Sequence, residues 1–257
     1  MTESSFKSFH SPLVAEKIVF LDEIGSTNEY AKELGRGGAH PGICVIAAKQ
    51  TAGRGRLGRS WDGGEASDIY MSALLKPKND PSHLTLMAGI CVRNVLSALL
   101  ASTPHNPLIK WPNDIIVDGK KICGILVEGG IFGTVVGIGI NVMRESFSSE
   151  LAGKATSLNM LTGIYHDRVE IIKALLAELS RYYEKFEEHG ISSFIDEYRS
   201  LCVNIGKAVI IHEQAAAYNA TAIGIDEYGR LEVILEDGQR RALDSGEVSV
   251  RGIYGKH

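Results

Sequence analysis

Apolar residues follow two alternating patterns along the chain. Short apolar runs between polar or glycine-rich segments predict strands over residues 17–21, 43–48, 115–117, 122–128 and 133–142. Apolar residues at helical spacing predict helices over residues 29–34, 82–100, 167–189 and 191–201. The turn Asp118-Gly119-Lys120 is of the hairpin type, so the last three strands form an antiparallel meander. An α+β sheet covered by helices is the expected architecture.

The longest helical segment, residues 167–189, carries an apolar stripe along one face. The stripe comprises Val169, Ile172, Leu175, Leu176, Leu179, Tyr183 and Phe186. Gly190 follows directly and ends the helix. We therefore expect this helix to pack on the sheet through that face.

The pattern changes after Val203. Strands are predicted over residues 207–211, 218–225, 231–235 and 239–243, and glycine-containing turns separate the last three. Closely spaced strands with tight turns predict a small barrel of about 50 residues. The chain is therefore expected to comprise a main domain, residues 1–203, and a small domain, residues 204–257. No low-complexity linker separates them, so the two domains are expected to pack together.

The composition is that of a soluble globular protein. Hydrophobic residues make up 44% of the 257 residues and charged residues 23%, which is enough for a real core. No apolar run approaches the roughly 20 residues that a membrane helix needs, and the first residues lack the apolar segment of a signal peptide. The four cysteines form no C-x-x-C and the eight histidines no H-E-x-x-H. We expect a cytoplasmic protein with reduced thiols, no metal site and no membrane contact.

Glycines and arginines are concentrated in one segment, the glycine–arginine loop (residues 53–63), which begins Gly-Arg-Gly-Arg-Leu-Gly-Arg-Ser-Trp. It matches G-x-G-x-x-G, but that motif and the P-loop both need a helix directly after the glycines. The residues after Trp61 are a poor helix start, so both assignments are rejected. The glycines still allow close backbone approach, and the arginines supply bidentate donors for phosphate or carboxylate. A net charge of −4 argues against a nucleic-acid tract and favours a local anion site.

Two further segments carry candidate chemistry. Lys110-Trp111-Pro112-Asn113-Asp114 offers a lysine, an aromatic ring, an amide and a carboxylate on a predicted exposed loop, where sites concentrate. Trp111 and Pro112 are alternatively core and turn, and Asp114 a turn cap. Lys121 precedes an apolar strand that contains Gly124, and a glycine in a strand often marks close approach of a ligand. A solvated surface lysine is the alternative for Lys121.

Six motifs in order resemble those of biotin protein ligases. They are Ser26-Thr27-Asn28, the run Gln50 to Arg59, Trp61, Lys110 to Asp114, Lys121-x-x-Gly124-Ile125-Leu126-Val127-Glu128 and Gly137-Ile138-Gly139-Ile140-Asn141. The resemblance covers nearly the whole chain and ends in Gly246-Glu247-Val248-Ser249-Val250-Arg251. It implies a mixed, largely antiparallel sheet with covering helices and a carboxyl-terminal SH3-like β-barrel. Only about sixteen residues precede the first strand, so the chain resembles the monofunctional form without an amino-terminal DNA-binding domain.

The family chemistry implied is ATP-dependent. Biotin and ATP with Mg²⁺ form biotinyl-5′-AMP and pyrophosphate, and a lysine of the biotin carboxyl carrier protein of acetyl-CoA carboxylase, or of a related biotin enzyme, then attacks the acyl phosphate. By resemblance, Lys121 holds the carboxylate and the forming acyl phosphate, Arg56 contacts phosphate, and Asp114 orients or deprotonates the carrier lysine. The implied biotin-binding set is Ser26, Thr27, Asn28, Gln50, Gly53, Arg54, Trp61, Lys121, Gly124, Leu126 and Gly139. The implied nucleotide-binding set is Arg56, Arg59, Lys110, Trp111, Asn113, Asn141 and Arg251.

One departure and three alternatives accompany the resemblance. Ser67-Asp68 stands where the family has Gly-Asn, which puts the detail of loop closure in question. A lipoate or octanoate ligase or transferase shares the fold but needs a long apolar slot and other signatures. A binding module without turnover and an arginine–glycine RNA-binding protein are the remaining classes, and the latter predicts a basic chain. No nucleic-acid partner is expected, and the oligomeric state stays open, with a homodimer as one option.

Overall fold

Mostly apolar strands build the large sheet of this protein. The computed structural model describes residues 13, 17–63, 67–213, 216–244 and 246–254. The strands of this sheet are β1 (Lys17–Ile24), β2 (Ile43–Gln50), β3 (Ile69–Leu75), β4 (Leu108–Lys110), β5 (Asp114–Val117), β6 (Lys120–Gly130) and β7 (Gly133–Ile140). They are ordered β1-β2-β3-β7-β6-β5-β4. Only the β1–β2 pair is parallel among these described strands, because helix α1 (Thr27–Arg36) provides the crossover that a parallel pair needs. The predicted β5–β6–β7 meander is confirmed.

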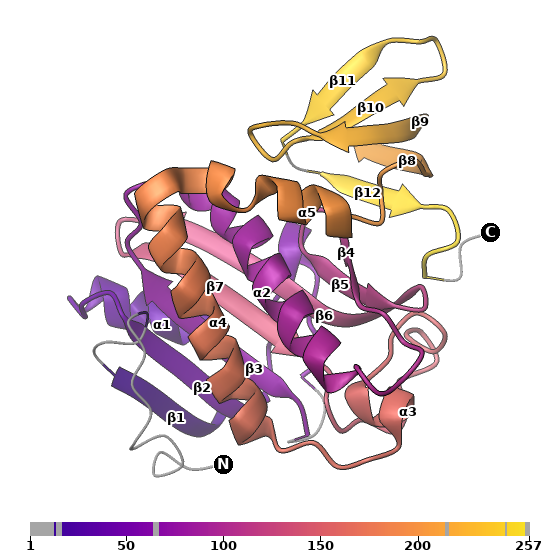
Figure 1. Ribbon diagram of the computed structural model, residues 1–257. Helices are drawn as coiled ribbons and strands as arrows, with labels where there is room; N and C mark the ends of the chain where they lie inside the picture. The colour runs from indigo at the N-terminus through magenta and orange to yellow at the C-terminus, as the bar shows by residue number, and fades with distance from the viewer. Residues whose placement is uncertain (1–12, 14–16, 64–66, 214–215, 245, 255–257) are drawn as a thin grey trace.

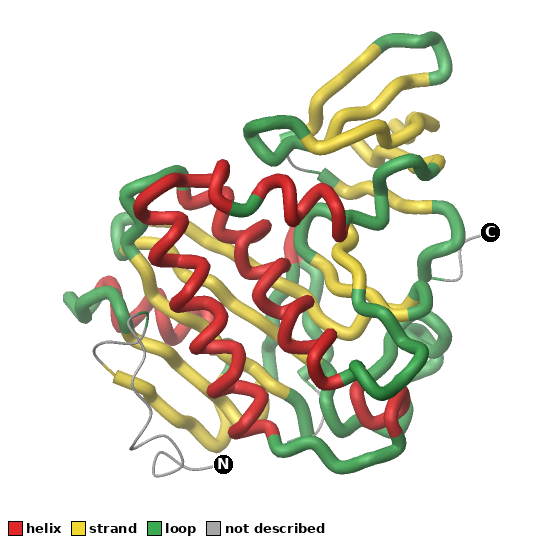
Figure 2. Tube along the Cα trace, in the orientation of Figure 1, coloured by secondary structure: helices red, strands yellow, loops and turns green. Residues whose placement is uncertain are grey.

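Helices cover both faces of this sheet. α2 (Leu84–Leu99) and α4 (Arg168–His189) run side by side across one face, as Figures 1 and 2 show. α1 packs on the opposite face through Ala31 against Val45, Leu74 and Val135. Because side chains alternate along a strand, Cys44 and Ile46 of β2 enter the main core instead. The sheet is thus buried on both sides over β2, β3 and β7, which explains why β3 is apolar at every position except Ser72.

Helix α2 is the most apolar helix of the fold. Together with the short helix η3 (Pro81–His83), it is long and apolar enough to pass for a membrane span on length and composition alone. Leu84, Met87, Ile90, Cys91 and Leu96 are all fully buried between the sheet and α4. α2 is therefore the central core helix of a globular domain, where apolar residues on most sides are expected.

The sheet of the small domain follows α5 (Ile195–Leu201). Its strands are β8 (Ala208–Glu213), β9 (Ala216–Ile225), β10 (Leu231–Leu235), β11 (Arg240–Leu243) and β12 (Glu247–Val250), in the antiparallel order β11-β10-β9-β8-β12. Figure 1 places it at one end of the large sheet, beyond α5 and β4. The boundary predicted at Val203 falls between α5 and β8. The Trp111 indole N–H donates to the carbonyl of Gly229 at 3.0 Å and joins the two domains.

Several local predictions need correction. The helix expected over residues 191–201 is a 3₁₀ turn, η4 (Gly190–Ser193), followed by α5, with Phe194 between them. In α4 the fully packed tyrosine is Tyr182, at 4% exposure, whereas Tyr183 is only half-buried. Tyr182 donates to Glu197 Oε2 at 2.5 Å, and a hydroxyl with a partner can be buried. β4 and α3 (Leu158–Thr162) were not predicted, because three- and five-residue elements have too little periodicity to detect.

Candidate functional site

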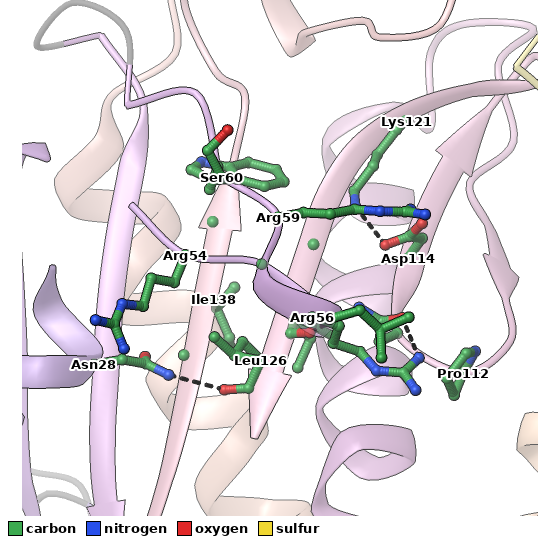
Figure 3. A pocket seen from close by; sticks show the side chains of 18 of the residues that line it. Asn28, Arg54, Arg56, Arg59, Ser60, Pro112, Asp114, Lys121, Leu126 and Ile138 are labelled. Carbon is green, nitrogen blue, oxygen red and sulfur yellow. Dashed lines mark hydrogen bonds and ion pairs between the residues drawn. The ribbon is translucent and has the colours of Figure 1, made fainter. Parts of the chain in front are cut away.

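A cavity of about 920 Å³, counted with its open mouth, lies between the glycine–arginine loop and strands β6 and β7. Figure 3 shows the side chains that line it, which come from α1, the loop, β5, β6 and β7. Sixteen of the predicted residues line it: Ser26, Thr27, Asn28, Gln50, Arg54, Arg56, Arg59, Trp61, Lys110, Trp111, Asn113, Asp114, Lys121, Gly124, Leu126 and Gly139. The three motif regions, far apart in sequence, therefore meet at one place.

Lys121 and Asp114 form the charged centre of the cavity. Lys121 Nζ lies 2.5 Å from Asp114 Oδ1, and the Tyr254 hydroxyl donates to Asp114 Oδ2 at 2.6 Å. Burial raises the pKa of the Asp114 carboxyl, but the charges of Lys121 and Lys110 outweigh it and hold that pKa below its usual value. Burial also raises the pKa of the Tyr254 hydroxyl well above its usual value, so it stays a donor. The cavity thus presents an ion pair, not a lone cation.

The ring of Trp61 packs directly on the two strand glycines. A Cβ at Gly124 would lie 2.7 Å from Trp61 Cζ3, and one at Gly139 would lie 2.7 Å from Trp61 Cε2. Lys121 Nζ lies 5.3 Å from the centroid of the same ring, within cation–π range. Trp61 Nε1 is buried without a hydrogen-bond partner among the described residues. The strand surface at Gly124, where the sequence predicts close approach of a ligand, therefore holds this indole in the present structure.

A buried hydrogen-bond network lies at the α1 end of the cavity. Gln50 Oε1 accepts from the backbone N–H of Thr27 at 2.7 Å and from its hydroxyl at 3.0 Å. The Ser72 hydroxyl lies 2.8 Å from Thr27 Oγ1 and donates to Asn28 Oδ1 at 2.6 Å. A Cβ at Gly137 would collide with Asn28 Oδ1 at 1.9 Å, which explains the glycine there. Satisfied networks of this kind hold polar groups rigidly in a low-dielectric wall.

Arg54 is turned toward the charged side chains next to this network. Asn28 Nδ2 donates to Glu128 Oε2 at 2.8 Å, and Lys32 Nζ pairs with both Glu128 and Glu29. Arg54 Nη1 pairs with Glu29 Oε1 at 2.6 Å, and more than half of its side chain is exposed. In Figure 3 the Arg54 guanidinium lies beside Asn28, away from Lys121.

Arg56 is directed instead toward the residues between β4 and β5. Its Nη1 donates to Asn113 Oδ1 at 3.0 Å, and Asn113 Nδ2 donates to the carbonyl of Ile125 at 2.9 Å. Burial lowers the pKa of the Arg56 guanidinium against the opposing charge of Asp114, but arginine stays cationic. Leu57 adopts a left-handed conformation with φ of 57°, and Gly58 follows at 73°, so the loop turns sharply behind Arg56.

Trp111 differs from the prediction of an exposed loop. Its side chain is 1% exposed, its ring N–H is bonded to Gly229, and its backbone N–H donates to Asn204 Oδ1 at 2.8 Å. The core alternative is therefore correct, because partners 93 and 118 residues away bury it. Trp111 still contributes to the lining of the cavity.

Three predicted residues lie outside the cavity lining. The Asn141 amide donates to the carbonyl of Thr156 at 3.0 Å and is buried. Arg251 is exposed in the small domain, where its backbone N–H bonds Ala208. Gly53 accepts from the backbone N–H of Trp61 and closes the base of the glycine–arginine loop. Their ligand contacts stay predictions.

Sequence reasoning missed four polar residues that support the site: Ser72, Tyr254, Asp68 and Arg144. Asp68, noted only as a departure from the family pattern, is fully buried and pairs with Arg144. Burial raises the pKa of the Asp68 carboxyl despite the neighbouring Arg144 charge. A charged residue directly before a mostly apolar strand was the available signal for Asp68. Ser72 and Tyr254 had no local signal, because their partners are distant in sequence.

Comparison with known proteins gives the same assignment over most of the chain. Residues 20–143 match the model of the biotin/lipoate A/B protein ligase family, and residues 205–251 match the biotin protein ligase C terminal domain. The chain is 32% identical over 252 residues to the bifunctional ligase/repressor BirA of Bacillus spizizenii, covering 94% of this chain and 77% of the relative. It is 33% identical over 216 residues to the biotin--[acetyl-CoA-carboxylase] ligase of Mycobacterium tuberculosis, covering 81% of this chain and 80% of the relative.

Solved structures agree with the sequence relatives. The biotin protein ligase of Aquifex aeolicus in complex with biotin and ATP superposes with a TM-score of 0.79 at 32% identity, covering 92% of this chain and 99% of that structure. The Leishmania major biotin protein ligase in complex with biotinyl-5-AMP superposes with a TM-score of 0.63 at 25% identity, covering 89% and 99%. The chain therefore belongs to the biotin/lipoate A/B protein ligase family.

Proposed function

We propose that this protein activates biotin with ATP as biotinyl-5′-AMP and transfers it to a lysine of the biotin carboxyl carrier protein of acetyl-CoA carboxylase or a related biotin enzyme. The observation that carries the proposal is the cavity in which Lys121, Asp114, Arg56 and Trp61 converge. Relatives named for this activity and a neighbour solved with biotin and ATP support it. The reaction releases pyrophosphate in the first step and AMP in the second.

The first step brings two anions together, which needs fixed positive charge. Lys121 is held on β6 by its ion pair with Asp114, and its ammonium faces the cavity. In the proposed complex the ammonium neutralises the biotin carboxylate and then the acyl phosphate, while Arg56 contacts the phosphate from the loop. Both cations already line the cavity before the substrates arrive, which lowers the cost of placing positive charge next to the reacting groups.

The uncharged end of biotin is proposed to lie at the α1 end of the cavity. The hydroxyls and amides of Ser26, Thr27, Asn28 and Gln50 are ordered there by Ser72 and by the backbone. Trp61 sits on Gly124 and Gly139, so a ligand that lies against these glycines must displace the indole, which then covers the ligand. Adenylate contacts are assigned to Arg59, Lys110 and Asn113, which line the other end.

Asp114 is proposed to act in the second step. The attacking carrier lysine must lose a proton, and a carboxylate with a lowered pKa is ionised and able to orient that ammonium near neutral pH. Tyr254 fixes one carboxylate oxygen and Lys121 the other. Substrate binding draws Lys121 toward the new anion, which leaves an Asp114 oxygen to accept from the incoming amine.

Mg²⁺ fits this site as a companion of ATP. The described residues hold no cluster of three or more histidine, cysteine or acidic side chains that could bind a metal. Asp114 is the one acidic side chain in the described cavity lining, and it is already engaged by Lys121 and Tyr254. Mg²⁺ commonly binds through substrate phosphates and water, where it neutralises charge on the leaving pyrophosphate. We propose a cytoplasmic location, where the four free, buried cysteines would stay reduced. We propose no nucleic-acid partner, because the net charge of −4 gives no basic field.

The direct test is pyrophosphate release with ATP and Mg²⁺, comparing biotin with lipoate and octanoate. Release is expected with biotin alone, followed by biotin transfer when a carrier protein is added. Release with lipoate or octanoate but not biotin would assign the chain to the other branch of the family. Absence of release with all three would leave a binding protein without turnover.

Gly124→Ala is expected to weaken biotin binding by about 1–3 kcal/mol, because the new Cβ overlaps the position of the Trp61 ring and the proposed ligand surface. Isothermal titration calorimetry with biotin measures the change. Gly129→Ala is the matched control, since it lies on the same strand and its Cβ would meet nothing within 4 Å. Equal affinities of the two variants would contradict the placement of biotin on β6.

A further inference from the structure

Arg144 lies just after β7, outside the cavity lining, and joins segments that are distant in sequence. Its Nη1 lies 2.7 Å from Asp62 Oδ2 and its Nη2 donates to the Asp62 carbonyl at 2.6 Å, while its Nε pairs with Asp68. The Arg144 side chain is only 8% exposed. A planar guanidinium that binds two carboxylates and a carbonyl fixes all three in one geometry.

Asp68 anchors this arrangement in the core. Asp68 Oδ1 accepts from the backbone N–H of Val142 at 2.9 Å, and the Arg168 guanidinium donates to the Asp68 carbonyl at 3.0 Å. Tyr70 donates to the carbonyl of Gly63 and lies 3.1 Å from Asp68 Oδ2. The buried end of the network is therefore rigid, and it connects to the glycine–arginine loop through Asp62 and through the carbonyl of Gly63.

Asp62 is adjacent to Trp61, whose ring covers Gly124 and Gly139. Arg144 also contacts the segment that follows it in the chain. Its carbonyl accepts from the Ser157 hydroxyl at 2.6 Å, and the Arg144 guanidinium lies 5.3 Å from the ring centroid of Phe147. The segment between Arg144 and Ser157 pairs with the backbone of Lys121. The Lys121 N–H donates to the carbonyl of Lys154 at 2.8 Å, and the Thr156 N–H donates to the carbonyl of Lys121 at 2.9 Å. One guanidinium therefore links the loop that carries Trp61 to the segment paired with the Lys121 backbone.

We infer that Arg144 is a positioning residue that anchors the glycine–arginine loop through Asp62 and so limits how far Trp61 moves when a ligand displaces its ring from Gly124 and Gly139. The inference rests on the proposed function for its kinetic consequence, which is retention of the activated intermediate. When the Asp62 carboxylate is lost, the loop loses its charge-assisted contact and keeps only the bonds that Arg144 and Tyr70 donate to the Asp62 and Gly63 carbonyls, while the buried Asp68–Arg144 pair remains. The loop then opens more often and biotinyl-5′-AMP escapes into solution before the carrier lysine arrives.

Asp62→Ala tests this, because Asp62 is 45% exposed and its removal leaves the core pair intact. The KM for biotin and the release of free biotinyl-5′-AMP are expected to rise roughly tenfold, the usual effect of losing one charge-assisted contact. The kcat for pyrophosphate release is expected to stay within about twofold of the wild-type value. Asp62→Glu is expected to recover most of the difference. Glu23→Ala is the control, since it removes an exposed acidic partner of Lys49 at 2.8 Å on β1.

Limited trypsin digestion gives a reading that does not depend on activity. Arg54, Arg56 and Arg59 are cleavage sites within the loop, and cutting there is expected to be faster in Asp62→Ala than in the wild type or in Glu23→Ala. Unchanged cutting together with an unchanged KM for biotin would overturn the inference. If Asp62→Ala is cut faster but the wild-type protein releases no pyrophosphate with biotin, the role of Arg144 in anchoring the loop is supported and the proposed function is rejected.

Discussion

Lys121→Ala is expected to lower the rate of biotin-dependent pyrophosphate release by about 10²- to 10³-fold. The ammonium is the cation that faces the point where the carboxylate and α-phosphate must meet, and solvent cannot replace it inside a cavity. Single-turnover measurements with ATP and biotin separate this loss from any change in binding. Wild-type-like release by Lys121→Ala would contradict the role assigned to Lys121.

Two companion variants make the Lys121 result specific. Lys120→Ala removes the neighbouring lysine of the same strand, which does not line the cavity, and should leave the rate unchanged. Lys121→Ala also leaves Asp114 without its nearest counter-ion, which is costly for a carboxylate in this position. The double variant Lys121→Ala, Asp114→Asn removes both charges, so a stable but inactive double variant distinguishes lost chemistry from lost folding.

Trp111→Ala is expected to lower the free energy of unfolding by about 3–5 kcal/mol, the usual cost of removing a buried tryptophan. The side chain is 1% exposed and its ring N–H is bonded to Gly229 across the domain boundary. Urea denaturation monitored by circular dichroism measures the loss. We also expect the small domain to become easier to unfold by itself.

Trp61→Ala is the matched control, because it makes the same chemical change on the glycine–arginine loop. Trp61 has a partly exposed side chain and an indole N–H without a partner among the described residues, so its loss should cost far less stability. It should instead weaken biotin binding. Trp111→Phe keeps most of the ring and leaves the Gly229 carbonyl unpaired, with an expected cost of about 1–3 kcal/mol. Equal stability losses for Trp61→Ala and Trp111→Ala would contradict the distinction.

The sequence predicted the elements that depend on local periodicity. Helix α4, with its cap at Asp167 and stop at Gly190, and the β5–β6–β7 meander both have patterns that are complete within one segment. The grouping of Lys121, Asp114 and the arginine loop rested on the order of motifs, not on periodicity. Family resemblance supplied that order, and the geometry brings the three segments to one cavity.

The sequence failed where a side chain is determined by distant partners. Trp111 was expected on an exposed loop because nothing near it indicates contacts with Asn204 and Gly229. The nucleotide role of Asn141 stays a prediction, but the bond from its amide to the carbonyl of Thr156 had no signal in the sequence. The Asp68–Arg144 pair spans 76 positions and had no counterpart in the motifs considered. Tertiary hydrogen bonds of this kind leave no periodic trace in the sequence.

The packing of Trp61 on Gly124 and Gly139 has an optical consequence. The chain contains two tryptophans, and the other, Trp111, is enclosed in the core between the domains. The emission of Trp61 should change when a ligand enters the cavity and moves its ring. The emission of Trp111 should stay unchanged until the two domains separate. The protein thus carries two intrinsic fluorophores, of which one reports loop position and the other reports domain association.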